Sequence, residues 1–96
     1  MERKALHLTL HKKWFDLILK GIKKTEYRDI KPYWTSRLFN KNGGQKFYSE
    51  IIFKNGYNKN SPIMRTKFLG VKKKNGRYAI FIGEIIGTSN CNNCNF

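Results

Sequence analysis

The sequence predicts a small α+β domain, a partly open β-barrel of five or six strands with one main helix and a short second helix. Five segments are rich in alternating, β-branched or aromatic residues, which is the pattern of strands. Only one longer segment has the spacing of an amphipathic helix. So few helices exclude a doubly wound parallel sheet, which needs helices on both faces. The 96 residues are enough for one hydrophobic core but not for two.

The chain opens with a strand and the main helix. Residues 5–10 alternate apolar and polar side chains, so they predict a strand with one buried face. The residues on that face are Leu6, Leu8 and Leu10. A helix of about three turns follows, and Gly21 is expected to end it, because glycine adopts the left-handed C-cap conformation without steric cost. At helical spacing with Ile18, Trp14 is expected to be a core residue rather than a platform on which a base stacks.

The segment after this glycine predicts a second strand with an unusual set of charges. The period of two places Glu26 and Arg28 on one face of the strand and Thr25 and Tyr27 on the other. Lys23 lies at the entrance to the strand. An acid and two bases are therefore expected close together on one surface.

The rest of the chain alternates between strands and loops. Pro32 ends the second strand and predicts the start of a short helix, because proline suits the first helical turn. The further elements are a loop at 40–45, a strand at 47–53, a loop at 55–62 and strands at 64–71 and 77–86. The last two strands are joined through residues 72–76, where Asn75-Gly76 is a hairpin signal. The domain is expected to span residues 1–87, with a loose polar tail at 88–96.

The charge of the chain is strongly one-sided. Twenty Lys and Arg residues against six Asp and Glu residues give a net charge of +14, and the pI is about 10.1. Such an excess is typical of a protein with a nucleic-acid partner. The alternative is an ordinary solvated surface in a chain whose codon bias has raised the numbers of both Lys and Asn residues. The size of the excess in so short a chain favours nucleic acid.

Other features of the sequence bear on location and cofactors. No apolar run reaches the roughly 18 to 20 residues that cross a bilayer, and the first residues do not form a continuous signal-peptide core. We therefore expect a cytoplasmic protein without a membrane partner. Cys91 and Cys94 form a single C-x-x-C pair without a second pair or a nearby histidine, which is weak evidence for zinc. Reduced thiols, and neither metal nor cofactor, are expected.

A series of motifs surrounds the second predicted strand. Its core is Gly21-x-Lys23-x-x-Glu26-x-Arg28, preceded by Trp14-Phe15-Asp16. Later motifs are Pro32-Tyr33-Trp34, Phe53-x-Asn55-Gly56-Tyr57 and Ile80-Phe81-Ile82-Gly83. Over residues 5–87 this order resembles the ASCH domain, a family of the PUA-like superfamily of small β-barrels, in the single-domain type found in bacteria and their phages.

The resemblance implies a cleft beside the first helix that binds RNA or a modified nucleobase. The expected binding residues are Lys23, Lys24, Glu26, Arg28, Trp34, Arg37 and Tyr57. By their chemistry, Lys23 suits a phosphate, Arg28 suits stacking or a bidentate contact, and Glu26 accepts a hydrogen bond from an exocyclic amine. Trp34 suits either a stacked base or a satellite of the core, and Tyr57 suits the lip of the cleft. The alternative for the charged residues is an ordinary ion pair across a strand face.

The resemblance also implies a second possibility, a small hydrolase. Some members of the family are N4-acetylcytidine amidohydrolases, and a ribonuclease type is reported. The catalytic candidates are Lys23 and Glu26, which supply acid–base chemistry only if the fold buries them. In the amidohydrolase pattern a threonine stands three residues after the lysine, where this chain has Glu26, and the adjacent Thr25 is predicted to face the other way. Glu84 is expected to be a surface carboxylate.

Overall fold

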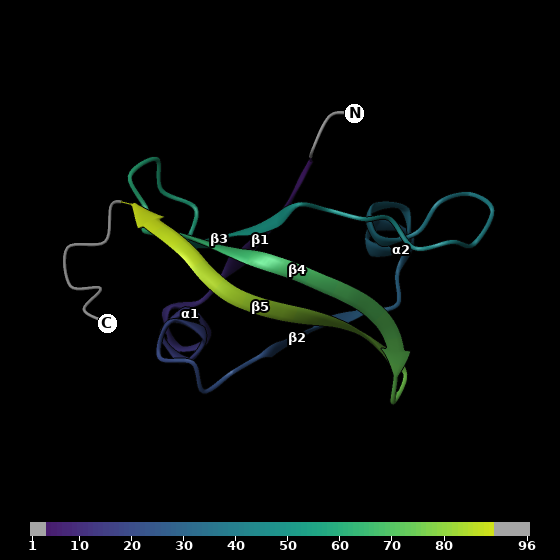
Figure 1. Ribbon diagram of the computed structural model, residues 1–96, viewed down its shortest axis with the longest axis horizontal. Helices are drawn as coiled ribbons and strands as arrows, with labels where there is room; N and C mark the ends of the chain where they lie inside the picture. Colours follow the sequence, from purple (N-terminus) through teal and green to yellow (C-terminus); the bar gives the residue numbers. More distant parts are fainter. Residues whose placement is uncertain (1–3, 90–96) are drawn as a thin grey trace.

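The computed structural model describes residues 4–89. Its elements are β1 (Ala5–Leu10), α1 (Lys12–Leu19), β2 (Thr25–Asp29), α2 (Pro32–Leu38), β3 (Glu50–Asn55), β4 (Ile63–Lys74) and β5 (Arg77–Ser89). The strands form one sheet in the order β1-β3-β4-β5-β2, in which only the β1–β3 pair is parallel. Figure 1 shows β4 and β5 as a long ribbon that curves across the molecule between the two helices. The predicted α+β class and the open, barrel-like sheet are confirmed.

The two edge strands of the sheet, β1 and β2, approach each other on the open side of this half-barrel. The Arg28 guanidinium of β2 donates a hydrogen bond of 3.2 Å to the Thr9 carbonyl oxygen of β1. Within residues 4–89 no strand pairing joins these two edges. We call this gap the seam. It leaves unpaired backbone groups and side chains of both edges accessible to a ligand.

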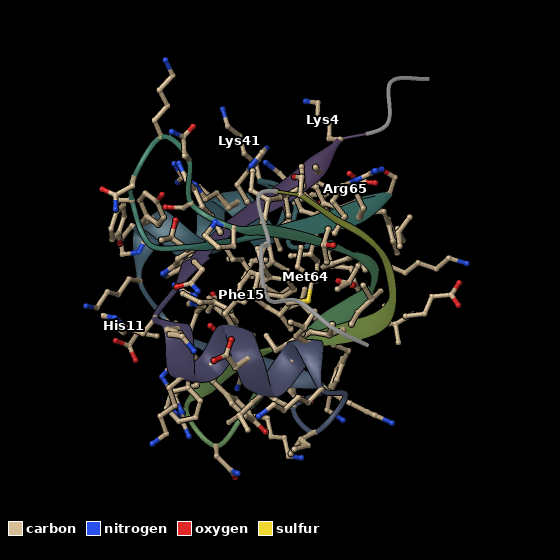
Figure 2. All side chains as sticks on the ribbon, turned by 90° about the vertical axis from the view of Figure 1, so that its left-hand side faces the viewer. Lys4, His11, Phe15, Lys41, Met64 and Arg65 are labelled. Atoms are coloured by element: carbon tan, nitrogen blue, oxygen red, sulfur yellow. The ribbon has the colours of Figure 1, made fainter. Side chains whose placement is uncertain are left out.

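The core fills the concave side of the sheet. The three leucines of β1 are buried as predicted, together with Phe15 of α1, Leu38 of α2 and Met64 of β4. Figure 2 shows Phe15 and Met64 pointing into the same interior, whereas Lys41 lies at the periphery. Burying a side chain of this size stabilises the fold by about 1.5–3 kcal/mol. The core therefore fixes α1 against one end of the sheet, next to the seam.

Helix α1 ends where the sequence predicts. Gly21 has φ 77°, its N–H donates to the Ile18 carbonyl, and the N–H of Ile22 donates to the Leu17 carbonyl. This pair of bonds is a Schellman motif, which requires the left-handed conformation that glycine allows. The helix has eight residues, or about two turns, rather than the predicted three.

The predicted burial of Trp14 is wrong. Its side chain is 41% exposed, whereas Phe15 is 1% exposed and Ile18 is 2% exposed. So short a helix covers only the end of the sheet, and only the face with these two residues meets the core. Trp14 lies one position before Phe15, about 100° around the helix axis, and borders the seam.

Strand β3 begins at Glu50, three residues later than predicted, and continues to Asn55. The aromatic residues before it belong to the connection from α2. Phe47 is 82% exposed, and the hydroxyl of Tyr48 donates to the Arg37 carbonyl oxygen. Burial raises the pKa of this tyrosine, although the charge of Arg37 acts in the opposite direction. Aromatic and β-branched composition predicts a strand here, but packing determines where the pairing starts.

The β4–β5 hairpin is longer than predicted because its turn contains only two residues. Asn75 and Gly76 have φ of 53° and 76°, the two positive values that a type I′ turn requires. Residues 72–74, expected in the connection, are the end of β4. The pairing of β4 with β5 shifts register between Arg65 and Gly70, and interruptions of a strand ladder such as β-bulges bend the strand.

At its other end, β5 continues to Ser89, which pairs with Ile63 at the start of β4. The first residues of the predicted tail are therefore part of the sheet, because β4 offers them pairing partners. Residues 90–96, with Cys91 and Cys94, lie outside the described part of the chain. Neither of the two helices found in residues 4–89 is long and apolar enough to span a membrane.

Candidate functional site

A cleft of about 520 Å³ opens at the seam. Its volume lies within the range of about 300–1,000 Å³ that small-molecule sites occupy. The cleft is lined by parts of β1, α1, β2, α2, β5 and the loop after β3, in the form of Thr9, Leu10, His11, Trp14, Lys23, Glu26, Tyr27, Arg28, Asp29, Trp34, Tyr57 and Arg77. The fold therefore assembles the cleft from segments that are far apart in the sequence.

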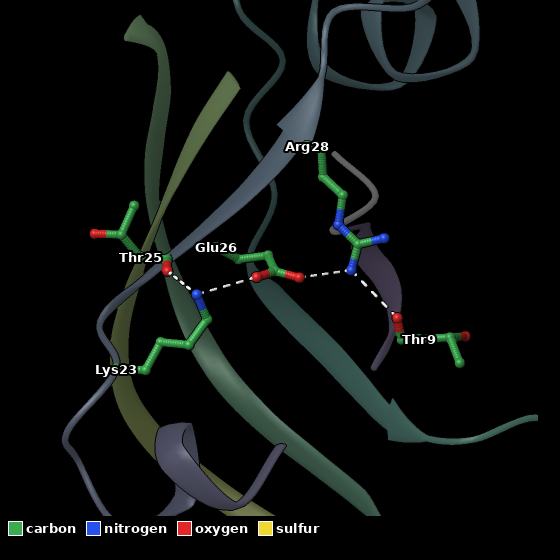
Figure 3. Close-up of polar contacts among 5 residues, drawn as sticks. All are labelled: Thr9, Lys23, Thr25, Glu26 and Arg28. Carbon is green, nitrogen blue, oxygen red and sulfur yellow. Dashed lines mark hydrogen bonds and ion pairs between the residues drawn. The ribbon is translucent and has the colours of Figure 1, made fainter. Parts of the chain in front are cut away.

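One carboxylate between two cations forms the centre of the cleft, as Figure 3 shows. The Lys23 ammonium lies 3.3 Å from Oε1 of Glu26, and the Arg28 guanidinium donates to Oε2 at 2.7 Å. We call these three residues the triad. The backbone holds both cations, because Lys23 also donates to the Thr25 carbonyl at 2.7 Å and Arg28 to that of Thr9. The predicted placement of Glu26 and Arg28 on one face of β2 is confirmed.

The triad is largely removed from water. The side chain of Glu26 is 9% exposed, that of Lys23 is 17% exposed and that of Arg28 is 20% exposed. Charges in such a position need partners, and one carboxylate with two cations leaves one positive charge in excess. The Nε–H of Arg28 is buried and has no hydrogen-bond partner within residues 4–89. An unsatisfied donor disfavours the folded state, so the triad is not arranged for maximal stability.

Cations alternate with aromatic rings along one wall of the cleft. The Lys23 ammonium lies 5.4 Å from the ring centroid of Trp14 and 5.6 Å from that of Tyr27. The Arg77 guanidinium follows, 4.8 Å from the Tyr27 ring. Cations over aromatic faces are stabilised by the ring quadrupole, so this wall has both charge and flat apolar surface.

Two further aromatic residues, Trp34 and Tyr57, line the cleft. The Arg28 guanidinium lies 4.9 Å from the ring centroid of Trp34, which is half-buried and packs against the core. Tyr57 stands at the lip of the cleft with 88% of its surface exposed. The loop that carries Tyr57 is tied to β1 by a hydrogen bond from the Gly56 N–H to the Leu10 carbonyl. The cleft thus offers a planar ligand the rings of four aromatic residues.

The structure gathers five of the seven predicted binding residues in the cleft, namely Lys23, Glu26, Arg28, Trp34 and Tyr57. Lys24 is exposed and borders a different pocket, lined by Ile18 and Gly83 among others. Arg37 lies on the exposed side of α2, where its guanidinium stacks 3.5 Å from the Tyr33 ring centroid. Neither side chain lines the cleft.

Sequence reasoning missed several residues that line the cleft. Periodicity places Trp14 in the core, and alternation indicates only that Tyr27 faces away from the motif residues. Arg77 reaches the cleft because β5 pairs with β2, which makes it the cross-strand neighbour of Asp29. For Trp14, the local signal that could have placed it at the cleft is its closeness in sequence to the charged motif.

The threonine next to Glu26 takes part only through its backbone. Figure 3 shows the Thr25 side chain directed away from the triad, while its carbonyl oxygen accepts from Lys23. The prediction that Thr25 faces the other way is confirmed. The part of the chain described here holds no group of three or more His, Cys, Asp or Glu residues that could bind a metal ion.

The fold and the cleft define a small basic half-barrel with a cation- and aromatic-lined site at its seam. No protein-family model matches the chain, and a search of curated proteins finds no match. The function is therefore inferred from the geometry of the cleft and the charge of the chain.

Proposed function

We propose that the protein binds RNA and holds one nucleotide in the cleft at the seam. The observation that carries the proposal is the combination of a buried carboxylate, cations and aromatic rings in a single cleft of a chain with a net charge of +14. Unstacked RNA bases are recognised by stacking on aromatic rings and by hydrogen bonds to their edges. The cleft offers both kinds of contact.

The triad retains hydrogen-bonding capacity for a ligand. Oε2 of Glu26 accepts a hydrogen bond from Arg28, and Oε1 forms only an ion pair with Lys23, so the carboxylate has lone pairs left to accept from a base N–H. In Arg28, the two donors on Nη2 bond Glu26 and Thr9, and Nη1 has donors left for a base or phosphate oxygen. Glu26 repels phosphate, so its role in a basic cleft is to select among bases and to orient the two cations.

Fold and sequence support the same proposal. A five-stranded half-barrel with a cleft beside the first helix is the architecture that the motif order implies, so we propose that the chain is a PUA-like barrel of the ASCH type. In this proposal Trp34 and Tyr57 provide stacking surface in the cleft. A cytoplasmic location, where RNA is available, fits this role.

A binding titration tests the proposal. Fluorescence anisotropy with short single-stranded RNAs at two salt concentrations should give an affinity that falls steeply with salt, because binding releases condensed counterions. Glu26→Gln should keep or strengthen this attraction and reduce discrimination among RNAs of different base composition. The control is Glu84→Gln, the same change in an exposed ion pair with Lys67, which should keep the discrimination. Absence of binding by the parent protein at low salt would overturn the proposal.

One observation favours a second candidate, a hydrolase acting on a modified nucleoside or on RNA. The Lys23 ammonium and the Glu26 carboxylate are 3.3 Å apart and mostly buried in the cleft, where an ammonium–carboxylate pair is able to transfer protons. Incubation with N4-acetylcytidine and with RNA tests this candidate. Turnover that Glu26→Ala abolishes in a folded protein would favour the hydrolase, whereas binding without turnover would favour the binding protein.

A further inference from the structure

A second basic surface lies at the tip of the β4–β5 hairpin. It consists of four exposed cations within six residues, namely Lys72, Lys73, Lys74 and Arg77. Within residues 4–89 none of them forms an ion pair with an acid. Other exposed cations do, since Lys12, Arg65 and Lys67 each bind a carboxylate. The tip therefore concentrates uncompensated positive charge.

The backbone holds these charges close together. The two-residue turn of Asn75 and Gly76 makes Lys74 and Arg77 direct cross-strand partners. Like charges in this position destabilise a strand pair. All residues from 72 to 77 are exposed, so core packing does not offset the repulsion, and Asp29, the other cross-strand neighbour of Arg77, forms its ion pair with Lys31 instead. A negatively charged ligand bound at the tip would relieve the repulsion.

The tip is continuous with the cleft. Arg77 belongs to both, since it pairs with Lys74 in the hairpin and its guanidinium lies over the Tyr27 ring in the cleft wall. In the sheet, Lys73 pairs with Tyr78 and Tyr78 pairs with Arg28 of the triad. Neighbouring strands are about 4.8 Å apart, so the backbones of Lys73 and Arg28 are separated by about 10 Å.

We propose that the hairpin tip is a phosphate-binding arm for the RNA strand whose nucleotide occupies the cleft. The inference rests on the proposed function and extends it from one nucleotide to the adjoining backbone. Lysine ammonium groups are point charges on flexible stems, which suit phosphates in varied geometry. No aromatic residue lies between residues 72 and 77, so the arm has no ring on which a base could stack. It therefore contributes affinity and orientation, and the cleft contributes base selectivity.

The test compares two double variants from which the same charge is removed. Lys73→Gln/Lys74→Gln removes two cations of the arm, whereas Lys4→Gln/Lys20→Gln removes two exposed cations that line neither the cleft nor the arm. For single-stranded RNA, the slope of log affinity against log salt falls by about 0.7 for each phosphate that the protein no longer neutralises. The arm variant should therefore show a slope smaller by up to about 1.4, or two such phosphates, and keep the parent's preference among bases. The control should keep the parent's slope.

Two further measurements make the result decisive. The melting temperature of the arm variant should equal or exceed that of the parent, because Lys74 no longer repels Arg77, so weaker binding would not come from unfolding. A nucleoside without phosphate should bind the arm variant and the parent equally. An unchanged salt slope, or a loss of base preference, in the arm variant would contradict the proposal that the hairpin tip binds phosphates. It would not contradict RNA binding by the parent. A parent that binds no RNA at low salt would overturn both the arm and the proposed function.

Discussion

Two acid–base clusters on strands of the same sheet differ in geometry and in surroundings. Between β3 and β4, Arg65 donates to both oxygens of Glu50 at 2.9 and 2.7 Å, a bidentate arrangement. Its guanidinium stands in solvent, with the side chain 48% exposed. In the triad, Glu26 receives one contact from each of two cations, yet all three side chains are at least four-fifths buried.

The bidentate hydrogen bonds therefore belong to Glu50 and Arg65, the cluster that contributes less to the stability of the fold. Water screens this pair because the Arg65 side chain is 48% exposed, although that of Glu50 is 18% exposed, so the pair contributes less than a fully buried one. A buried pair is different, because removing one partner leaves the other charge without water or a counter-ion. We infer that burial decides which cluster is costly to break. The triad also lines the cleft at the seam, and neither Glu50 nor Arg65 is among the residues that line it.

The largest expected effect comes from Glu26→Ala. The change leaves Lys23 and Arg28 beside each other in a mostly buried position without their carboxylate. Loss of one partner of a buried pair costs roughly 3–5 kcal/mol, and because both cations keep some contact with water we expect about 2–4 kcal/mol here. Urea unfolding followed by circular dichroism measures the change in the free energy of unfolding.

The matched control for this variant is Glu84→Ala. Glu84 binds Lys67 at 2.8 Å, but the two side chains are 70% and 57% exposed. At most a slight decrease in the urea midpoint is expected, far smaller than that of Glu26→Ala, because both groups are already solvated. Equal decreases in the two variants would contradict the argument that burial, and not the presence of an ion pair, sets the cost.

A smaller effect is expected from Arg28→Lys. Lysine keeps the positive charge but lacks the planar fork with which Arg28 reaches Glu26 and the Thr9 carbonyl and stacks on Trp34. Removing one of these hydrogen bonds should lower the free energy of unfolding by about 1–2 kcal/mol. Amide hydrogen exchange should become faster in β1 and β2, because this side chain bridges the seam.

The same substitution in the exposed pair is the control. Arg65→Lys replaces a bidentate contact with a single one on the outer surface and should leave hydrogen exchange in β1 and β2 unchanged. If Arg28→Lys also leaves these strands unchanged, the guanidinium does not hold the seam together. The edges would then be kept in place by core packing alone.

Features set by neighbouring residues were predictable from the sequence. The glycine cap of α1, the alternation of β2 and the type I′ turn at Asn75-Gly76 depend on local backbone preferences and are found where expected. The placement of Glu26 beside Arg28 follows from the period of two, so the centre of the cleft could be located from sequence.

Features that depend on contacts distant in sequence could not be predicted. Whether Trp14 faces the core or the seam depends on how much of α1 the sheet covers, and periodicity does not supply that information. Arg77 enters the cleft only through the pairing of β5 with β2. The start of β3 is set by Tyr48, whose hydroxyl donates to the carbonyl of Arg37, so this residue packs against α2 and does not join the sheet.

The smallest expected effect is a difference in acid sensitivity between the parent and variants of the exposed pairs. The hydrogen bonds from Arg65 hold the pKa of Glu50 below its ordinary value of about 4.5, and the hydrogen bond from Lys67 likewise lowers the pKa of Glu84. A carboxyl group whose pKa is lower in the folded state stabilises the fold above the unfolded pKa. This contribution disappears as the pH falls through the folded pKa.

Glu50→Gln and Glu84→Gln should therefore lower the urea midpoint slightly at pH 7, and the difference from the parent should shrink as the pH falls below about 4.5 and through the lower folded pKa. The urea midpoints of parent and variants are compared from about pH 7 down to about pH 3. The variant with both substitutions should differ most from the parent at pH 7 and so show the largest change in this difference. Because Glu84 and Arg65 stand in solvent, which screens both ion pairs, the shift should be far smaller than the effect of Glu26→Ala. Midpoints that stay parallel to those of the parent across this range would mean that neither exposed pair couples to folding, and that the triad alone links charge to stability.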